Sequence, residues 1–326
     1  MKKALVLLSG GLDSLLAYKI IENEGIDVLG LHYINPIATR HPEQAEEIFQ
    51  KNNLKYIQIS NFIDFLEILK TPKFGFGKNL NPCIDCRLLN IRLAVEEMND
   101  RHFDFLVTGE VQGQRPKSQL RNALDIIESA SGIKGLLLRP LSAKILPPTV
   151  PELKGWVNRE NLYGIQGRSR AIQMEITKKF NITEYASPGG GCPLTAKEYS
   201  KKMKDLLDYD LLTADQVGLL NIGRHFRLND NIKFIIGRNN EDNLKLLKIS
   251  ETFNCIIIDE KTVSGPVSVL LGNPDDNDLR LPMRVVASYT KVSGEIIMKW
   301  RNSSDNIWKD IIVVPFARNE IEKFRI

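Results

Sequence analysis

Residues 5–20 read LVLLSGGLDSLLAYKI, and this stretch decides the fold of the first part of the chain. An apolar strand pattern leads into the tight turn SGGLDS at residues 9–14, and a helical pattern follows. This succession predicts the strand, turn and helix that begin a βα unit. Adjacent glycines let main-chain N–H groups approach a ligand, and the N-terminal end of a helix favours an anion. The turn is therefore expected to bind phosphate.

Asp13 is the unusual member of this turn, because a carboxylate repels phosphate. It fits better as a magnesium ligand or as a group that orients the loop. Glycine pairs also occur in ordinary strand-to-helix turns, but the full string SGGLDS resembles the PP-loop, SGGxDS, of the ATP pyrophosphatase superfamily. The Walker A pattern GxxxxGK[ST] is not present. The resemblance implies that ATP and Mg²⁺ bind here, with Ser9, Gly10, Gly11, Asp13 and Ser14 as contacts.

Length and composition are those of a globular protein with two or three domains. The chain has 326 residues, of which 43% are hydrophobic and 26% are charged. It contains no run of 18 apolar residues, so no membrane span is expected, and we expect a cytoplasmic protein. Segment 110–180 has a net charge of +6, whereas the whole chain has +4. A basic surface beside an ATP site would suit a polyanionic substrate, although a solvated basic face would have the same composition.

Apolar and helical patterns alternate over residues 1–110, which predicts an α/β domain with a parallel sheet and helices on both faces. The expected strands are 3–8, 27–34, 55–59 and 104–108, and the expected helices lie near 14–24, 42–52, 61–70 and 86–99. Ligands of such sheets bind at the carboxyl ends of the strands. Leu31, His32, Thr108 and Gly109 are therefore further candidates for nucleotide contacts, although a structural role is also open for His32.

Beyond this region the pattern is less regular. Segment 139–167 is rich in Pro and Gly and is expected to follow the surface, and a helix is expected at 168–180. We expect a domain boundary near residue 195, giving domains 1–195 and 196–326. The second should be a smaller α+β domain with helices near 197–208, 241–249 and 275–289, strands at 232–236, 254–258 and 267–271, and two strands within 294–316.

Three of the four cysteines are expected in loops, close to Pro or Gly. Cys83 and Cys86 form the C-x-x-C of PCIDC, and Cys192 lies in PGGGCP. They suit an iron–sulfur cluster with three thiolate ligands, a redox or persulfide relay, or a zinc site completed by a histidine or Asp85. Cys255 lies in an apolar strand pattern and is expected to be a buried core residue.

The motifs together resemble those of PP-loop tRNA thiolation enzymes of the thiouridine synthetase type. They are SGGLDS, NPCIDC, TGEVQGQRPKSQ, LLRPLSAK, GRSR and PGGGCPLT. The resemblance covers about residues 1–196 and implies an adenine nucleotide alpha hydrolase-like fold. In related thiolases three cysteines hold a [4Fe-4S] cluster, while other branches use two cysteines for persulfide chemistry. The matching cluster ligands here are Cys83, Cys86 and Cys192.

The sequence NIGRHFRLNDNIKFIIGRNNEDN resembles the small RNA-binding domain of ribosome quality-control (NFACT) factors. This resemblance implies RNA contacts by Arg224, Arg227, Lys233 and Arg238. The alternative is a second domain that only packs against the first domain and binds no RNA. Within segment 110–180, we expect RNA contacts by Arg115, Lys117, Arg168 and Arg170. The sequence does not decide whether tRNA phosphates or the phosphate tail of ATP are bound by Arg115, Lys117, Arg139 and Lys144.

The resemblance implies an ATP-dependent tRNA sulfurtransferase with a [4Fe-4S] cluster, in which Asp13, Cys83 and Cys192 carry the chemistry. Its partners would be tRNA and a sulfur donor, either free sulfide or a sulfur carrier, and a homodimer is a possible assembly. The alternatives are a cluster-free thiolase that uses cysteine persulfide, a PP-loop amidating enzyme, and an ATP-gated RNA-binding protein with structural zinc.

Overall fold

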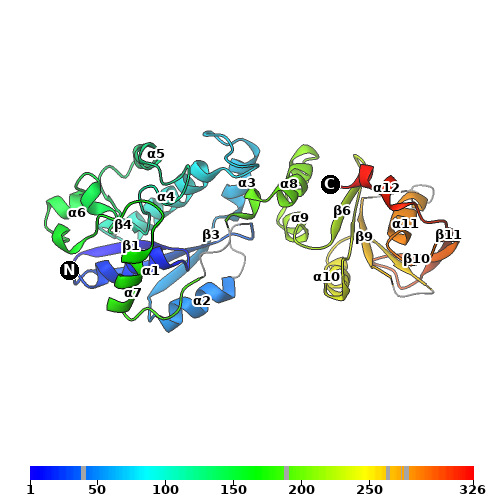
Figure 1. Ribbon diagram of the computed structural model, residues 1–326, viewed down its shortest axis with the longest axis horizontal. Helices are drawn as coiled ribbons and strands as arrows, with labels where there is room; N and C mark the ends of the chain where they lie inside the picture. Colours follow the sequence, from blue (N-terminus) through cyan, green and yellow to red (C-terminus); the bar gives the residue numbers. More distant parts are fainter. Residues whose placement is uncertain (38–41, 187–190, 262–264, 273, 275–278) are drawn as a thin grey trace. The chain divides into compact units, whose positions relative to one another are not determined.

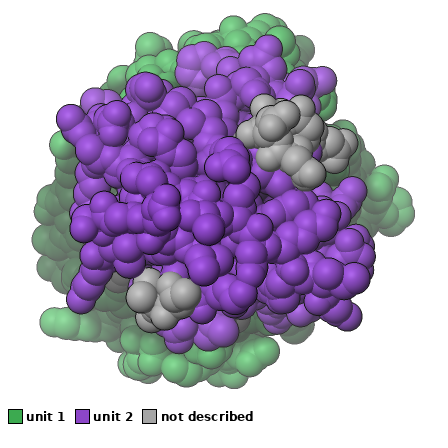
Figure 2. All heavy atoms as spheres, turned by 90° about the vertical axis from the view of Figure 1, so that its right-hand side faces the viewer, with its two compact units in different colours: residues 1–196 green, residues 197–326 purple. Residues whose placement is uncertain are grey.

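The computed structural model describes residues 1–37, 42–186, 191–261, 265–272, 274 and 279–326. These residues form two compact units, Met1–Ala196 (unit 1) and Lys197–Ile326 (unit 2), which are coloured separately in Figure 2. None of the described helices combines the length and apolar character that a membrane crossing requires.

Unit 1 is built on a parallel sheet that has five strands in the described part of the chain, in the order β3-β2-β1-β4-β5 (Figure 1). Four of these strands were expected from the sequence, and β5 was not. The strands are β1 (Lys3–Leu8), β2 (Asp27–Ile34), β3 (Tyr56–Ser60), β4 (Phe105–Thr108) and β5 (Leu137–Leu138).

Helices cover both faces of this sheet, which confirms the expected α/β fold. One face packs against α1 (Leu12–Glu22), α2 (Pro42–Lys51) and α7 (Ala171–Lys179). The other packs against α4 (Cys83–Asp100) and α5 (Arg121–Ser131), and α3 (Phe62–Lys70) contacts α4. Segment 139–167 forms only short elements, but the expectation that it follows the surface was wrong in part, because Leu141, Ala143 and Ile165 are buried in the core. The short elements and a later turn are η1 (Ala143–Ile145), α6 (Val150–Leu153), η2 (Arg159–Asn161) and η3 (Pro193–Thr195).

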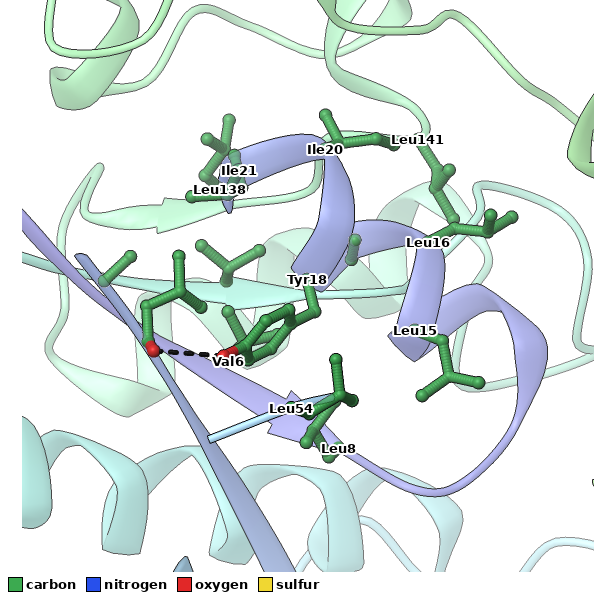
Figure 3. Close-up of a cluster of buried hydrophobic side chains, with 14 of the residues drawn as sticks. Val6, Leu8, Leu15, Leu16, Tyr18, Ile20, Ile21, Leu54, Leu138 and Leu141 are labelled. Carbon is green, nitrogen blue, oxygen red and sulfur yellow. Dashed lines mark hydrogen bonds between the residues drawn. The ribbon is translucent and has the colours of Figure 1, made fainter. Parts of the chain in front are cut away.

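The core beneath α1 fixes the position of the loop that precedes this helix. Residues of β1 alternate between the two faces, so that Val6 and Leu8 belong to the same apolar cluster as Leu15 and Tyr18 of α1 (Figure 3). Tyr18 is 1% exposed, and its hydroxyl donates a hydrogen bond of 3.1 Å to the carbonyl of Val28 on β2. The first helix is thereby held against two strands of the sheet.

Unit 2 contains an antiparallel sheet in the order β11-β10-β8-β9-β7-β6 (Figure 1). Its strands are β6 (Arg224–Asn229), β7 (Ile232–Ile236), β8 (Ile256–Glu260), β9 (Ser268–Leu271), β10 (Ile296–Asn302) and β11 (Lys309–Val313). Its helices are α8 (Lys197–Asp208), α9 (Ala214–Leu219), α10 (Asn240–Ser250), α11 (Arg280–Ala287), α12 (Arg318–Ile321) and η4 (Glu322–Phe324). The helix expected at 275–289 begins at Arg280 within the described residues, and positions 275–278 lie outside them.

The described residues of unit 2 include two apolar clusters. The first includes residues of α11, and the second includes Leu246 of α10 together with Cys255. Cys255 is 2% exposed, which confirms that it is a buried core residue.

Candidate functional site

The turn between β1 and α1 has the main-chain geometry of an anion site. Gly10 has a φ of +74°, in the left-handed region that glycine tolerates, and Gly11 is the N-cap of α1 without a side-chain cap. Ser14 Oγ donates to the carbonyl of Gly11 at 2.8 Å and accepts from the N–H of Ser9 at 3.2 Å. The hydroxyl therefore closes the loop, and the first N–H groups of α1 have no side-chain acceptor capping them.

Asp13 lies in the first turn of α1 and has one satisfied and one unsatisfied oxygen. Its Oδ2 accepts a hydrogen bond of 3.0 Å from Nε2 of Gln114, while its Oδ1 is buried with no partner in the described structure. The Oε1 atom of Gln114 is also buried without a partner. Buried acceptors of this kind are uncommon, and hard cations such as Mg²⁺ prefer oxygen ligands. The atoms present thus fit a nucleotide-bound Mg²⁺ at Asp13.

Gly109 follows β4 and packs directly against the phosphate loop. A Cβ atom at this position would lie 2.4 Å from the carbonyl carbon and oxygen of Asp13 and 2.6 Å from the nitrogen of Ser14. Only glycine allows this approach. The neighbouring Thr108 is fully buried, and its hydroxyl donates to the Glu110 carboxylate at 3.1 Å, so its side chain supports Glu110 rather than a ligand.

The expected nucleotide contacts on β2 lie in the core. The Leu31 side chain is fully buried in the cluster beneath α4. His32 is 3% exposed, its Nδ1 lies 3.0 Å from the carbonyl oxygen of Leu8, and its ring packs edge-on against Phe49. Burial lowers the pKa of His32, although the Leu8 carbonyl acts in the opposite direction. These placements argue against nucleotide contacts by either side chain and favour the structural role that was open for His32.

Cys83 and Cys86 form the first turn of α4, and the loop before them is held in place by Asp85. The Asp85 carboxylate accepts hydrogen bonds from the main-chain N–H groups of Lys73 at 2.9 Å and Phe74 at 3.1 Å. The Cys83 thiol donates to Oδ1 of Asn81 at 2.8 Å. Asp85 therefore anchors the Gly/Pro-rich loop that delivers the cysteines.

The third cysteine is brought to the same place from a distant segment. Nδ2 of Asn79, in the loop before α4, donates to the carbonyl of Thr195 at 2.9 Å, and Thr195 Oγ1 donates to the carbonyl of Cys192 at 2.7 Å. The pKa of Cys86 is raised to about 12, first by burial and then by the nearby Cys192 and Cys83, while Arg87 acts in the opposite direction. Cys86 thus lies near both other thiols.

Their chemistry, but not their present spacing, fits a metal cluster. Three thiols without a fourth protein ligand suit a cluster with one open iron. Across the described ranges, no group of three or more His, Cys, Asp or Glu side chains is close enough to hold a metal ion. Positions 187–190, within the expected glycine loop before Cys192, lie outside these ranges.

Glu110 lies just after β4, and its carboxylate is buried against two arginines. It is 1% exposed and accepts from Nε of Arg87 at 2.7 Å and from Nε of Arg139 at 3.0 Å. Burial would raise the pKa of Glu110, but the two guanidinium charges outweigh it and lower the pKa to about 2. Arg87 directly follows Cys86 on α4, so Glu110 connects the end of β4 to the cysteine-bearing helix.

Arg139 was expected to face tRNA or the ATP tail, and this interpretation was wrong. Its side chain is 5% exposed and also pairs with Glu128 of α5 at 2.9 Å. The sequence shows an acidic residue, Glu110, just after the strand expected at 104–108, but no local pattern marks it as the buried partner of Arg139.

Basic side chains lie beside the cysteines. Arg115 and Lys117 are exposed, and their charges lower the pKa of Cys83, which burial raises. The N–H of Gly167 donates to the carbonyl of Gln112 at 2.8 Å, which joins the segment before Arg168 to the segment before Arg115. Arg168 is exposed and Arg170 half-buried. The basic residues singled out in the two segments therefore border one region of unit 1.

In unit 2 the expected RNA contacts separate into two groups. Arg227 and Lys233 are 8% and 2% exposed, and both pair with Asp205, at 3.0 Å from Arg227 Nη2 and 2.8 Å from Lys233 Nζ. This internal ion pair corrects the expectation of RNA contacts at these two positions. Arg238 pairs with Asp242 but is 47% exposed, and Arg224 is half-buried.

Fold and site together define an α/β domain with a phosphate loop and an adjacent group of three cysteines. Residues 1–144 match the family described as thiamine biosynthesis protein (ThiI), and residues 223–325 match the family described as NFACT protein RNA binding domain. The first segment is thus similar to ThiI and the second to the NFACT RNA-binding domain, in agreement with the resemblance seen in the motifs.

Curated relatives are similar over part of their length. The chain is 30% identical over 170 residues to the tRNA-specific 2-thiouridylase MnmA of Treponema denticola, covering 44% of this chain and 45% of the relative. It is 28% identical over 143 residues to the tRNA sulfurtransferase of Desulfurococcus amylolyticus, covering 43% of this chain and 29% of the relative. The chain therefore spans less than half the length of these relatives.

Among solved structures, a predicted subunit of tRNA methyltransferase from Methanocaldococcus jannaschii aligns with 19% identity and a TM-score of 0.33. The alignment covers 48% of this chain and 76% of that structure.

Proposed function

We propose that the chain is an ATP-dependent tRNA sulfurtransferase that replaces a uridine carbonyl oxygen with sulfur. One observation carries the proposal: segment 114–117 contacts both the turn at Asp13 and the surroundings of Cys83. Gln114 donates to Asp13, and the charges of Arg115 and Lys117 lower the pKa of Cys83. On this proposal, four consecutive residues would join the ATP-activating loop to the sulfur-bearing group. The names of the relatives supply the reaction class, and the NFACT-type unit favours RNA as the substrate.

The first step would form a bond between the uridine carbonyl oxygen and the α-phosphate of ATP, and would release pyrophosphate. The N–H groups at Gly10 and Gly11 and the Ser14 region would hold phosphate oxygens, and Asp13 Oδ1 would hold the Mg²⁺ that neutralises their charge. The second step would form the carbon–sulfur bond and release AMP. Arg115 and Lys117 would hold tRNA phosphates beside the thiols.

Cys83, Cys86 and Cys192 would hold a [4Fe-4S] cluster, which when bound supplies an open iron that can carry sulfide. A second candidate is a cluster-free route through a cysteine persulfide. It is favoured by the lack of a metal-holding group within the described ranges and by the hydrogen bond from the Cys83 thiol to Asn81. Both candidates use the same cysteines, so metal analysis must separate them.

The decisive experiment measures iron, acid-labile sulfide and zinc per chain on anaerobically purified protein. About four irons with matching sulfide, lost in Cys83→Ala, Cys86→Ala and Cys192→Ala but kept in Cys255→Ala, are the expected result. Cys255 is the matched control because it is buried in unit 2. Zinc, or no metal, would contradict the cluster and leave the persulfide route. Pyrophosphate release that needs neither tRNA nor a sulfur source would contradict the sulfurtransferase itself.

A further inference from the structure

Unit 2 contains a group of arginines around one tyrosine, which we call the Tyr289 cluster: Arg224, Tyr289, Arg318 and Arg325. Tyr289 follows α11, and its ring lies edge-on to Phe226 of β6 at 6.2 Å between centroids. The guanidinium carbon of Arg224 lies 4.8 Å from the centre of the Tyr289 ring, and that of Arg318 lies 5.7 Å from it. Residues from β6, α12 and the end of α11 therefore meet at one ring.

Arg325 reaches the cluster because the last residues of unit 2 lie along β6. Arg325 forms an antiparallel bridge with Phe226, and the N–H of Ile326 donates to the carbonyl of His225 at 3.1 Å. The Arg325 side chain is 42% exposed. Its backbone is thus fixed in the sheet while its charged group remains in contact with solvent.

The cluster has an excess of positive charge. The charges acting on the Tyr289 hydroxyl come from Arg224, Arg318, Arg325 and one carboxylate, Glu322, which lies 3.3 Å from Arg325. The internal cations Arg227 and Lys233 differ in that both are buried and share Asp205 as their counter-ion. Among the described residues of unit 2, the Tyr289 cluster therefore contains more arginines than carboxylates that pair with them.

Such a group suits a ligand that is both anionic and planar. Guanidinium groups bind phosphate oxygens with several donors, and arginine and tyrosine faces stack on unpaired bases. An acidic peptide would use the charge but not the stacking surfaces. We propose that the Tyr289 cluster is an RNA-contacting surface of unit 2, with Arg318 and Arg325 on the phosphates and the Arg224–Tyr289 pair beside a base. RNA as the partner rests on the proposed function.

Arg318 and Arg325 are the positions to test, because Arg224 also donates to the carbonyl of Gly237 and its loss could loosen the sheet. The full chain and its Arg318→Ala, Arg325→Ala and Lys309→Ala variants would be titrated against a fluorescein-labelled single-stranded RNA and against unfractionated tRNA, without ATP or sulfide. Lys309 is the matched control. It is exposed, lies 4.7 Å over the Trp300 ring, and belongs to β11, at the opposite edge of the sheet from β6.

We expect each arginine variant to bind RNA at least roughly fivefold more weakly than the wild type. The magnitude of the slope of log affinity against log salt should fall by about 1. Lys309→Ala should change neither quantity by as much. Equal losses in all three variants would reveal non-specific attraction and overturn the proposal, as would unchanged binding in both arginine variants. Displacement of the RNA by an acidic peptide of equal charge would also overturn it, since stacking would then contribute nothing.

The result is independent of catalysis. Wild-type protein that binds RNA through the cluster but shows no RNA-dependent pyrophosphate release contradicts the proposed function and leaves the cluster intact. Wild-type protein that thiolates tRNA while the arginine variants bind RNA normally contradicts the cluster alone. Thermal unfolding of each variant identifies any loss of binding that comes from loss of fold.

Discussion

Nε2 of Gln114 lies 3.0 Å from Oδ2 of Asp13, and this hydrogen bond joins the segment after β4 to the first turn of α1. The bond leaves Oδ1 of Asp13 unpartnered and buried. Gln114 therefore fixes which carboxylate oxygen remains available for a cation. Its role is to position Asp13.

Gln114→Leu should lower RNA-dependent pyrophosphate release about tenfold, because a hydrogen bond to a charged group is worth about 1.5–3 kcal/mol. Gln119→Leu is the control, since Gln119 is a buried glutamine of the same motif whose Oε1 has no partner in the described structure. Steady-state assays over a range of ATP and Mg²⁺ concentrations measure the effect. Equal losses in both variants would show that Gln114 acts only through the fold of the segment.

Glu110→Gln should destabilise unit 1 in a pH-dependent manner. The pKa of Glu110 is lowered from 4.5 to about 2, so the folded state prefers the ionised carboxylate. This preference is worth about 3 kcal/mol above pH 4.5 and is lost as the pH falls toward 2. The wild-type advantage in free energy of unfolding should therefore fall from about 3 kcal/mol at pH 7 to about 1 kcal/mol at pH 3.

Urea unfolding at several pH values measures this difference. Glu128→Gln is the matched control, because Glu128 pairs with the same Arg139 but is 29% exposed, and we expect a smaller effect. A difference between wild type and Glu110→Gln that stays constant from pH 7 to pH 3 would contradict the assignment.

Asp205→Asn should destabilise unit 2 by about 3–5 kcal/mol, because it leaves Arg227 and Lys233 without their shared counter-ion in the interior. Asp208→Asn on the same helix removes only an exposed pair with Lys204 and should change stability by about 0.5 kcal/mol or less. Hydrogen exchange resolved by segment would place the loss in unit 2. If the two variants were equally stable, the Asp205 ion pairs would contribute little.

Gly109→Ala should reduce both stability and ATP-dependent activity, because its Cβ would lie 2.4 Å from the carbonyl group of Asp13. Overpacking of this kind costs about 1–3 kcal/mol. Gly164→Ala is the control, since the nearest atoms would lie 3.4 Å from the new Cβ. Thermal unfolding and ATP binding are measured on both variants. The prediction is contradicted if Gly109→Ala and Gly164→Ala give the same results.

Periodicity and turn residues were sufficient to predict most of unit 1. Each long strand has an apolar pattern of its own, and the glycine turn places the phosphate loop. Strand β5 was missed because two residues, Leu137–Leu138, are too few to show a period. Strand β6 was missed because its sequence RHFRLN is interrupted by charged residues. Its buried side includes Phe226, while Arg227 pairs with Asp205 on a helix.

The candidate site was predictable where chemistry follows from local sequence, as for SGGLDS and the C-x-x-C. The convergence of Cys192 with Cys83 and Cys86 depended on the family resemblance, because spacing alone cannot bring distant segments together. The arginines were the least predictable group. The sequence suggests that Arg139 and Arg227 are surface charges. Their structural role is visible only in the folded protein, where each pairs with a buried carboxylate.

The meeting of Cys192 with Cys83 and Cys86 also sets an order of events during synthesis. The ribosome must release nearly all of unit 1 before the hydrogen bond between Asn79 and Thr195 can form and bring the third thiol into place. On the proposed function, a nascent chain that carries only the first two cysteines would have an incomplete sulfur site. Loading of that site would then be a late step of biogenesis, and its occupancy would be a sign that unit 1 was made in full and has folded.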